Sequence, residues 1–193
     1  MESEEKSNIN QPILTFRSKS NEIIRVSKIS KQDAWNICNF VVANEDRLLD
    51  FFPGTREQNL TPELSEIFVK LKEKQFLAKE EYLFTLRSET SHKIIGLIYI
   101  KELDWVKKQG EFAYTIDYNF EGKGIISGII SHLSKYAFDY LGLNILQIIV
   151  HKTNIRSCKV AENNGFKWIK TLPNEFTPRG KKPMDMELYE LYK

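Results

Sequence analysis

Two glycines flank a lysine at Gly122-Lys123-Gly124, directly before the largely apolar run of residues 125–141. Apolar residues at helical spacing in that run predict a helix that begins at the glycines. The first amides of a helix have no partner inside it and carry the positive end of its dipole, so they favour an anion. Glycine also lets a ligand approach the backbone closely. The sequence therefore predicts a phosphate-binding loop at residues 122–126.

Three classes of phosphate ligand compete for this loop. A nucleoside triphosphate requires G-x-x-x-x-G-K-[ST], which the loop does not have. The dinucleotide pattern G-x-G-x-x-G fits except at Ser127, where the third glycine should stand. That pattern also requires a buried apolar strand before it and an acidic residue about 20 positions later. Here residues 110–118 alternate, and the next predicted strand ends in His151-Lys152. Coenzyme A is the third class, because its pyrophosphate needs the same amides without a fixed partner for the ribose.

The elements that must position the loop form a mixed α/β pattern around one sheet. Alternating or apolar runs predict strands at residues 22–30, 81–87, 92–103, 110–118, 144–150, 166–172 and 184–192. Helical spacing predicts helices at residues 31–52, 61–76, 125–141 and 154–164. Pro53-Gly54 are expected to break the first helix, and Thr61 and Asn154 are expected to cap the N-termini of two others. Gly165 is expected to end the last helix.

The composition favours a single cytoplasmic domain. A chain of 193 residues with 41% hydrophobic content can bury one core and is short for two. We expect a flexible tail at residues 1–20, whose start is acidic and polar, and one domain at residues 21–193. The 28 basic and 26 acidic side chains nearly balance, so no nucleic-acid partner is expected. No apolar run approaches the roughly 20 residues that span a bilayer, and no membrane association is expected.

The cysteines and histidines do not indicate a metal site. Cys38 and Cys158 lie in predicted helices and are expected to be reduced thiols. His92, His132 and His151 show no ligand spacing with them. We therefore expect no bound metal, and the sequence leaves a monomer and a homodimer open.

Three segments together resemble a known family: EFAYTID, EGKGIISGII and NIRSCKVAENNGF, in this order and at this spacing. They are similar to the Gcn5-related N-acetyltransferase (GNAT) superfamily, and within it to the Rim-type branch that acetylates protein N-termini and related amines. The resemblance extends from about Ile23 to the end of the chain. It implies a mixed α/β single-domain fold, in which helices flank a mostly antiparallel sheet with a V-shaped splay between two strands. It also implies acetyl-CoA as cosubstrate and a primary amine as acceptor, either a protein N-terminus or a small molecule.

The family's glycine motif, Q/R-x-x-G-x-G/A, falls on residues 121–126. Gly124 matches its central glycine, whereas Glu121 stands where glutamine or arginine is usual and Ile126 where glycine or alanine is usual. A carboxylate beside a pyrophosphate is unfavourable unless it points away. The resemblance assigns coenzyme A binding to Ile116, Asp117, Tyr118, Glu121, Gly122, Lys123, Gly124, Ile125, Ile126, Asn154 and Ser157.

The resemblance further implies direct attack of the amine on the thioester, with a backbone N–H near Tyr114–Ile116 beside the developing oxyanion. Glu111 is the candidate base, acting through a water, and His151 is its rival. The tyrosine acid that many superfamily members carry is replaced by Ala161, so Ser157 is left to stabilise the leaving thiolate. An α-amino group, with a pKa of about 7.7–8.0, loses its proton more easily than a lysine-like amine at about 10.4, which favours an N-terminal substrate.

The acceptor is expected to lie between the loops at residues 48–59 and 172–183. Candidate contacts there are Phe51, Phe52, Phe176, Arg56 and Glu175. Two hypotheses from other classes stay open. One is a non-catalytic acyl-CoA-binding sensor with the same fold, and the other is a dinucleotide-binding oxidoreductase.

Overall fold

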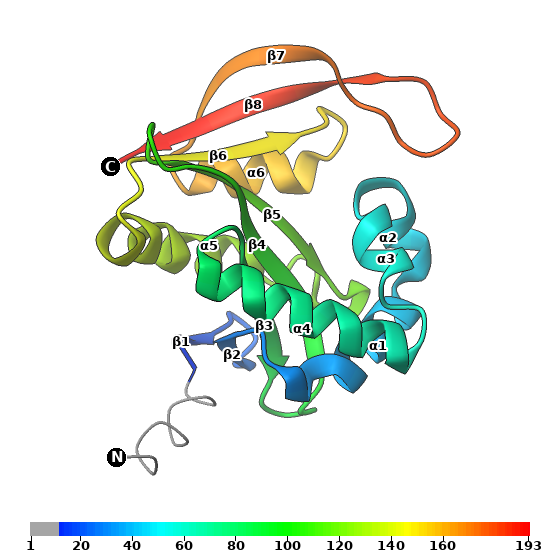
Figure 1. The fold of residues 1–193 in the computed structure, drawn as a ribbon. Coiled ribbons are helices and arrows are strands. Elements are labelled where there is room, and N and C mark those ends of the chain that lie inside the picture. Colours follow the sequence, from blue (N-terminus) through cyan, green and yellow to red (C-terminus); the bar gives the residue numbers. More distant parts are fainter. Residues whose placement is uncertain (1–11) are drawn as a thin grey trace.

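One eight-stranded sheet runs through the protein in the order β1-β2-β3-β4-β5-β6-β8-β7 (Figure 1). The structure, a computed structural model, describes residues 12–193. Its strands are β1 (Leu14–Arg17), β2 (Ile23–Lys28), β3 (Tyr82–Ser88), β4 (Ile94–Asp104), β5 (Gln109–Ile116), β6 (Ile145–Val150), β7 (Lys167–Phe176) and β8 (Met184–Tyr192). Neighbouring strands pair antiparallel except β5 and β6, which are parallel. The predicted mixed α/β fold with a mostly antiparallel sheet is confirmed.

The parallel strands β5 and β6 pair only over part of their length. Their register runs from Gln109 opposite Ile145 to Phe112 opposite Ile148. Beyond Phe112, β5 continues to Ile116 beside β4 alone, while β6 continues beside β8. The two strands therefore diverge, and Figure 1 shows them opening toward the side where α2 and α3 lie. This is the V-shaped splay that the sequence comparison implied.

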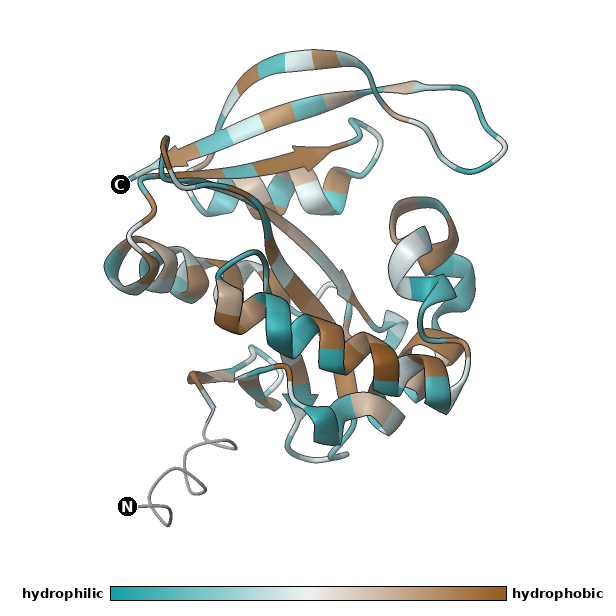
Figure 2. Cartoon of the chain, viewed as in Figure 1, coloured by the Kyte–Doolittle hydropathy of each residue, from teal (hydrophilic) through white to brown (hydrophobic). Residues whose placement is uncertain are grey.

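Helices cover both faces of the sheet. They are α1 (Ala34–Ala43), α2 (Glu45–Phe51), α3 (Pro53–Glu57), α4 (Pro62–Ala78), α5 (Ile125–Tyr136) and α6 (Ile155–Asn163), with short turns η2 (Lys31–Asp33), η3 (Tyr118–Phe120) and η4 (Ala137–Leu141). Alternation along β3 divides the core, because Leu83 packs with α1 and α4 whereas Phe84 packs with α5. In Figure 2, β6 is hydrophobic along most of its length and the loop between β7 and β8 is largely hydrophilic.

The helix predicted over residues 31–52 is divided into η2, α1 and α2. Asn44, between α1 and α2, bonds through both its backbone N–H and its side-chain amide to the carbonyl of Phe40. Pro53 and Gly54 were expected to break the helix, and this prediction is confirmed: α2 ends at Phe51, and Pro53 begins the separate short helix α3. Proline is well tolerated at the first helical position, because its missing N–H would have no partner there.

The strand β1 lies inside the segment expected to be a tail. Its Phe16 ring packs on Gly128 of α5, where an added Cβ would lie 2.2 Å from the ring. The ordered domain therefore begins before residue 21. The sequence near β1 does not predict this strand, because β1 has only four residues and its apolar contact comes from a helix more than 100 residues later in the chain. The first part of the expected tail, residues 1–11, lies outside the described residues.

The predicted helix caps are present. Thr61 Oγ1 accepts a hydrogen bond from the N–H of Leu64 at 3.3 Å, and Asn154 Oδ1 accepts one from the N–H of Ser157 at 3.2 Å. Gly165, which follows α6, has a φ of +79°, a left-handed conformation typical of helix stops. In residues 12–193, no helix is long and apolar enough to cross a membrane.

Candidate active site

The glycine loop opens α5 as the sequence predicts. Gly122 and Gly124 have φ angles of +70° and +73°, in the left-handed region that favours glycine. The first bond into the helix runs from the N–H of Gly128 to the carbonyl of Gly124, at 3.0 Å. The preceding amides of Ile125 and Ile126 therefore have no partner within the helix and can bind an anion.

A cavity of about 610 Å³ lies where β5 and β6 diverge. Its walls come from α2 with Phe52, the end of β5, the glycine loop with the start of α5, and α6. This volume lies within the range of about 300–1,000 Å³ that small-molecule and cofactor sites occupy. The cavity thus joins the predicted phosphate loop to the open part of β5.

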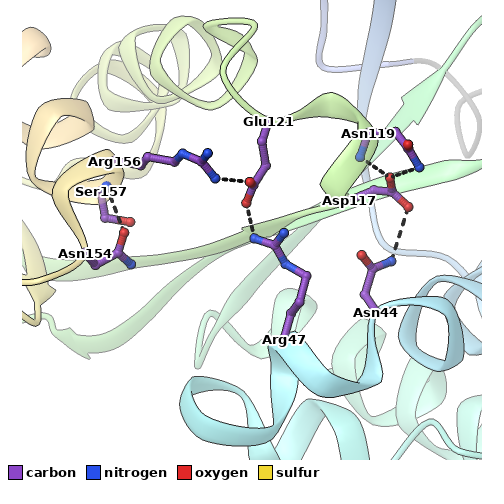
Figure 3. Close-up of polar contacts among 8 residues, drawn as sticks. All are labelled: Asn44, Arg47, Asp117, Asn119, Glu121, Asn154, Arg156 and Ser157. Carbon is purple, nitrogen blue, oxygen red and sulfur yellow. Dashed lines mark hydrogen bonds and ion pairs between the residues drawn. The ribbon is translucent and has the colours of Figure 1, made fainter.

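Most of the side chains expected to contact coenzyme A line this cavity: Ile116, Glu121, Gly122, Gly124, Ile125, Ile126, Asn154 and Ser157. Asp117, Tyr118 and Lys123 lie outside its wall. Asp117 instead accepts hydrogen bonds from the N–H of Asn119 at 2.8 Å and from the amide of Asn44 at 3.3 Å (Figure 3). The Tyr118 side chain is exposed, and the Lys123 ammonium lies 4.9 Å from the centre of the Phe120 ring.

The carboxylate of Glu121 is held between two arginines. Arg47 reaches it from α2 and Arg156 from α6, and each forms an ion pair with one of its oxygens (Figure 3). Only 13% of the Glu121 side chain is exposed. One negative charge between two positive ones leaves a net positive group beside Gly122, so this carboxylate does not oppose a phosphate as the sequence suggested. Neither arginine was predicted, because Arg47 is 74 residues from Glu121 in the chain.

Two hydroxyl groups meet the cavity near the start of α6. Ser157 contributes one, and its N–H, not its hydroxyl, takes part in the cap with Asn154. Tyr114 of β5 contributes the other, and it donates a hydrogen bond to the carbonyl of Ser157 at 3.4 Å. Burial raises the pKa of Tyr114, so its phenol stays protonated. Ala161, where many superfamily members carry a tyrosine, is fully buried.

Glu111 lies outside this cavity, in the middle of the sheet. It pairs in register with Lys101 of β4 and Gln147 of β6, and its carboxylate is 3.0 Å from the Lys101 ammonium. Burial raises the pKa of Glu111, and the positive charge of Lys101 partly offsets that effect. Such a carboxyl binds a proton more strongly than an exposed glutamate does. His151, the rival base, follows β6 and lies half-buried outside the cavity wall, with Nδ1 2.7 Å from the hydroxyl of Thr153.

The two loops expected to surround the acceptor meet each other. The rings of Phe51 and Phe176 stack with centroids 5.5 Å apart. The Lys181 ammonium lies 2.7 Å from both oxygens of Asp50, so the β7–β8 loop also contacts α2 through an ion pair. Arg56, a candidate to recognise acceptor charge, pairs instead with Glu45 of α2. The negative charge of Glu175 contributes to the raised pKa of Glu111.

The chain is similar to known proteins in sequence and in fold. The family model for the acetyltransferase (GNAT) domain matches residues 24–167. The protein YdaF of Bacillus subtilis (strain 168), whose name suggests a ribosomal N-acetyltransferase, is 28% identical over 151 residues, which cover 78% of this chain and 81% of YdaF.

Two solved structures show the same fold. The ribosomal-protein-S5-alanine acetyltransferase of Vibrio fischeri matches with a TM-score of 0.83 and 20% identity, over 93% of this chain and 96% of that one. The spermidine N-acetyltransferase of Vibrio cholerae, solved with coenzyme A and spermine, matches with a TM-score of 0.70 and 20% identity, over 88% of this chain and 95% of that one.

The family match covers most of the sheet, the glycine loop and α6, and it replaces the dinucleotide-binding hypothesis. The chain belongs to the GNAT acetyltransferase family and is an acetyl-CoA-dependent N-acetyltransferase of the GNAT type.

Proposed function

We propose that this protein acetylates the α-amino group of a protein N-terminus, with a small primary amine as the alternative acceptor. The observation that carries the proposal is the cavity at the divergence of β5 and β6, with a helix N-terminus at one end and two contacting loops beside it. The names of YdaF and the Vibrio fischeri enzyme support a protein substrate, and that of the Vibrio cholerae enzyme supports a polyamine. An α-amine also deprotonates more easily near neutral pH.

The donor would lie along the cavity. The amides at the start of α5 would bind the pyrophosphate of acetyl-CoA. The edge of β5 beyond Phe112 has no β6 partner, so its backbone groups can pair with the amides of the pantetheine arm as an added strand would. A backbone N–H near Tyr114–Ile116 would stabilise the oxyanion that forms when the amine attacks the thioester.

Proton transfer would use residues on both sides of the thioester. Glu111 would accept the proton of the attacking amine through a water, since its raised pKa makes it a stronger base. Ser157 would donate a hydrogen bond to the leaving thiolate, since the Tyr114 phenol nearby already donates its proton to the Ser157 carbonyl. His151 is the alternative base and would require the acceptor to approach from the end of β6.

A thiol-release assay tests this function. We expect acetyl-CoA and coenzyme A, but not NADH or ATP, to raise the melting temperature. Peptides with a free α-amine should then release free coenzyme A, and the same peptides with a blocked N-terminus but an internal lysine should not. Turnover with spermidine and not with peptides would move the proposal to the small-amine class. Binding of acetyl-CoA without turnover on any amine would favour the sensor hypothesis.

A further inference from the structure

Two arginines share one carboxylate at the end of the cavity where the donor phosphates are expected. Arg47, Arg156 and Lys159 line it together with Asp46, Asp50 and Glu121, and the single Glu121 carboxylate contacts both arginines. The two guanidinium groups therefore have one negative charge to share. They come from different helices, on opposite sides of the cavity, and meet at the residue that directly precedes Gly122 (Figure 3).

This arrangement is more specific than an ordinary surface ion pair. Exposed pairs contribute little to stability, and long side chains lose entropy when they are held in one place. Here the Glu121 side chain is only 13% exposed and that of Arg47 40% exposed, whereas the Arg156 side chain, at 74%, is exposed except where its guanidinium meets Glu121. Guanidinium groups bind phosphate in a two-pronged geometry that matches carboxylate binding, so either partner can replace the other.

We propose that Arg47 and Arg156 bind the phosphate groups of the acetyl donor directly, and that Glu121 holds both guanidinium groups beside the glycine loop until the donor replaces it. The inference rests on the acetyl-CoA chemistry above and deepens it. In the family motif this position usually carries glutamine or arginine. Here Glu121 occupies it, and the positive charge is supplied from α2 and α6 instead.

The two arginines lie beside the position that the glycine loop predicts for the pyrophosphate. A pyrophosphate at the amides of Ile125 and Ile126 lies a few residues from Glu121, which both guanidinium groups already reach. The cluster of one carboxylate and two guanidinium groups has a net charge of +1. The exchange involves no covalent step: ion pairs to Glu121 are replaced by ion pairs to phosphate oxygens.

Calorimetric titration of coenzyme A tests the inference. We expect Arg47→Ala and Arg156→Ala each to raise the Kd about ten-fold or more, because each removes a charge-assisted contact. Arg25→Ala is the matched control. Arg25 of β2 lies outside the cavity wall and also pairs with a single glutamate, Glu89, so the Kd of this variant should equal that of the unmodified protein. An unchanged Kd in Arg47→Ala would overturn the role of Arg47. Failure of the unmodified protein to bind coenzyme A would instead contradict the proposed function.

A second titration separates direct binding from simple neutralisation of Glu121. If Arg47 binds phosphate, Arg47→Ala must weaken binding in a Glu121→Gln background as well. If Arg47 only cancels the charge of Glu121, the loss must vanish in that background, and this result would overturn the inference. Arg47→Lys, which keeps the charge without the two-pronged geometry, should give an intermediate Kd and guards against misfolding of the alanine variant.

Truncated ligands identify the phosphate. Dephospho-coenzyme A lacks the 3′-phosphate, whereas pantetheine lacks all phosphates. If Arg47→Ala weakens the binding of dephospho-coenzyme A as much as that of coenzyme A, Arg47 contacts the pyrophosphate. If Arg47→Ala weakens the binding of coenzyme A alone, Arg47 contacts the 3′-phosphate. An equal loss with pantetheine would contradict any phosphate contact.

Discussion

The Phe51 ring at the end of α2 stacks on Phe176 at the end of β7, with centroids 5.5 Å apart and ring planes at 18°. Phe51 also lines the cavity, so this stack joins the cavity wall to the end of β7. The adjacent ion pair between Asp50 and Lys181 supports the same contact. The helix that carries Arg47 toward the glycine loop therefore also carries the residues that contact the β7–β8 loop.

Removal of the stacked ring should affect the acceptor more than the donor. We expect Phe176→Ala to raise the acceptor KM several-fold while the acetyl-CoA KM changes less than two-fold, because Phe176 lies outside the cavity wall. An aromatic pair contributes about 0.5–1.5 kcal/mol beyond its area, so the loss of stability should be small. Steady-state kinetics with each substrate varied in turn measures both constants. Tyr140→Ala, which removes a stack with Tyr136 away from the site, is the control, and an equal effect there would contradict the prediction.

The raised pKa of Glu111 should affect how both stability and activity depend on pH. Its folded-state pKa is raised, so its contribution to stability is present below the unfolded value of about 4.3 and is lost as the pH rises through the folded value. The difference in melting temperature between the neutral variant Glu111→Gln and the unmodified protein should therefore shift in favour of the variant as the pH rises from 4 to 8. Its kcat/KM should fall at least about 100-fold if Glu111 is the base. Retained activity in this variant would transfer the role to His151.

The lysine beside Glu111 provides a separate test of the pH dependence. Lys101 holds the pKa of Glu111 down, so Lys101→Met should raise that pKa further and move the acid limb of the kcat/KM profile to higher pH. Lys135→Met removes an exposed lysine that pairs with Asp139 on α5–η4 and should leave the profile unchanged. A profile that does not move in Lys101→Met would show that the acid limb reports another group.

The hydroxyl of Ser157 can be removed without loss of the helix cap. The cap uses the Ser157 N–H and the Asn154 side chain, so Ser157→Ala should keep it. We expect kcat to fall about ten-fold or more with little change in the Kd of coenzyme A, since a hydrogen bond to the leaving thiolate acts in the transition state. Asn154→Ala is the comparison, because it removes the cap and should cost about 1 kcal/mol of stability. Parallel losses of kcat and binding in Ser157→Ala would contradict a role at the sulfur.

The contact between β1 and α5 should be measurable as a coupling. Gly128→Ala places a methyl group 2.2 Å from the Phe16 ring and should destabilise the domain by about 1–3 kcal/mol. In a Phe16→Ala background the same change should cost much less, because the ring is gone. Chemical unfolding of the four proteins gives this double-mutant cycle. Additive losses would show that β1 does not pack on α5.

Local features of this protein follow from its sequence alone. Thr61 and Asn154 cap their helices, and Gly122 and Gly124 adopt left-handed backbone conformations, because cap and turn preferences depend on residues within a few positions. Alternation predicted the half-buried strands for the same reason. These signals were sufficient to locate the glycine loop, the start of α6 and the order of the elements other than β1 and α3.

The tertiary structure decided which distant residues share the site. Arg47 and Arg156 converge on Glu121, Tyr114 lies beside Ser157, and β1 packs on Gly128. Each contact joins segments tens of residues apart, and the divergence of β5 and β6 brings most of them together at one cavity. Charge and burial at such contacts depend on the packing of the whole sheet. The sequence around Glu121 therefore suggested that its carboxylate would repel a phosphate, whereas in the folded protein two arginines neutralise that carboxylate.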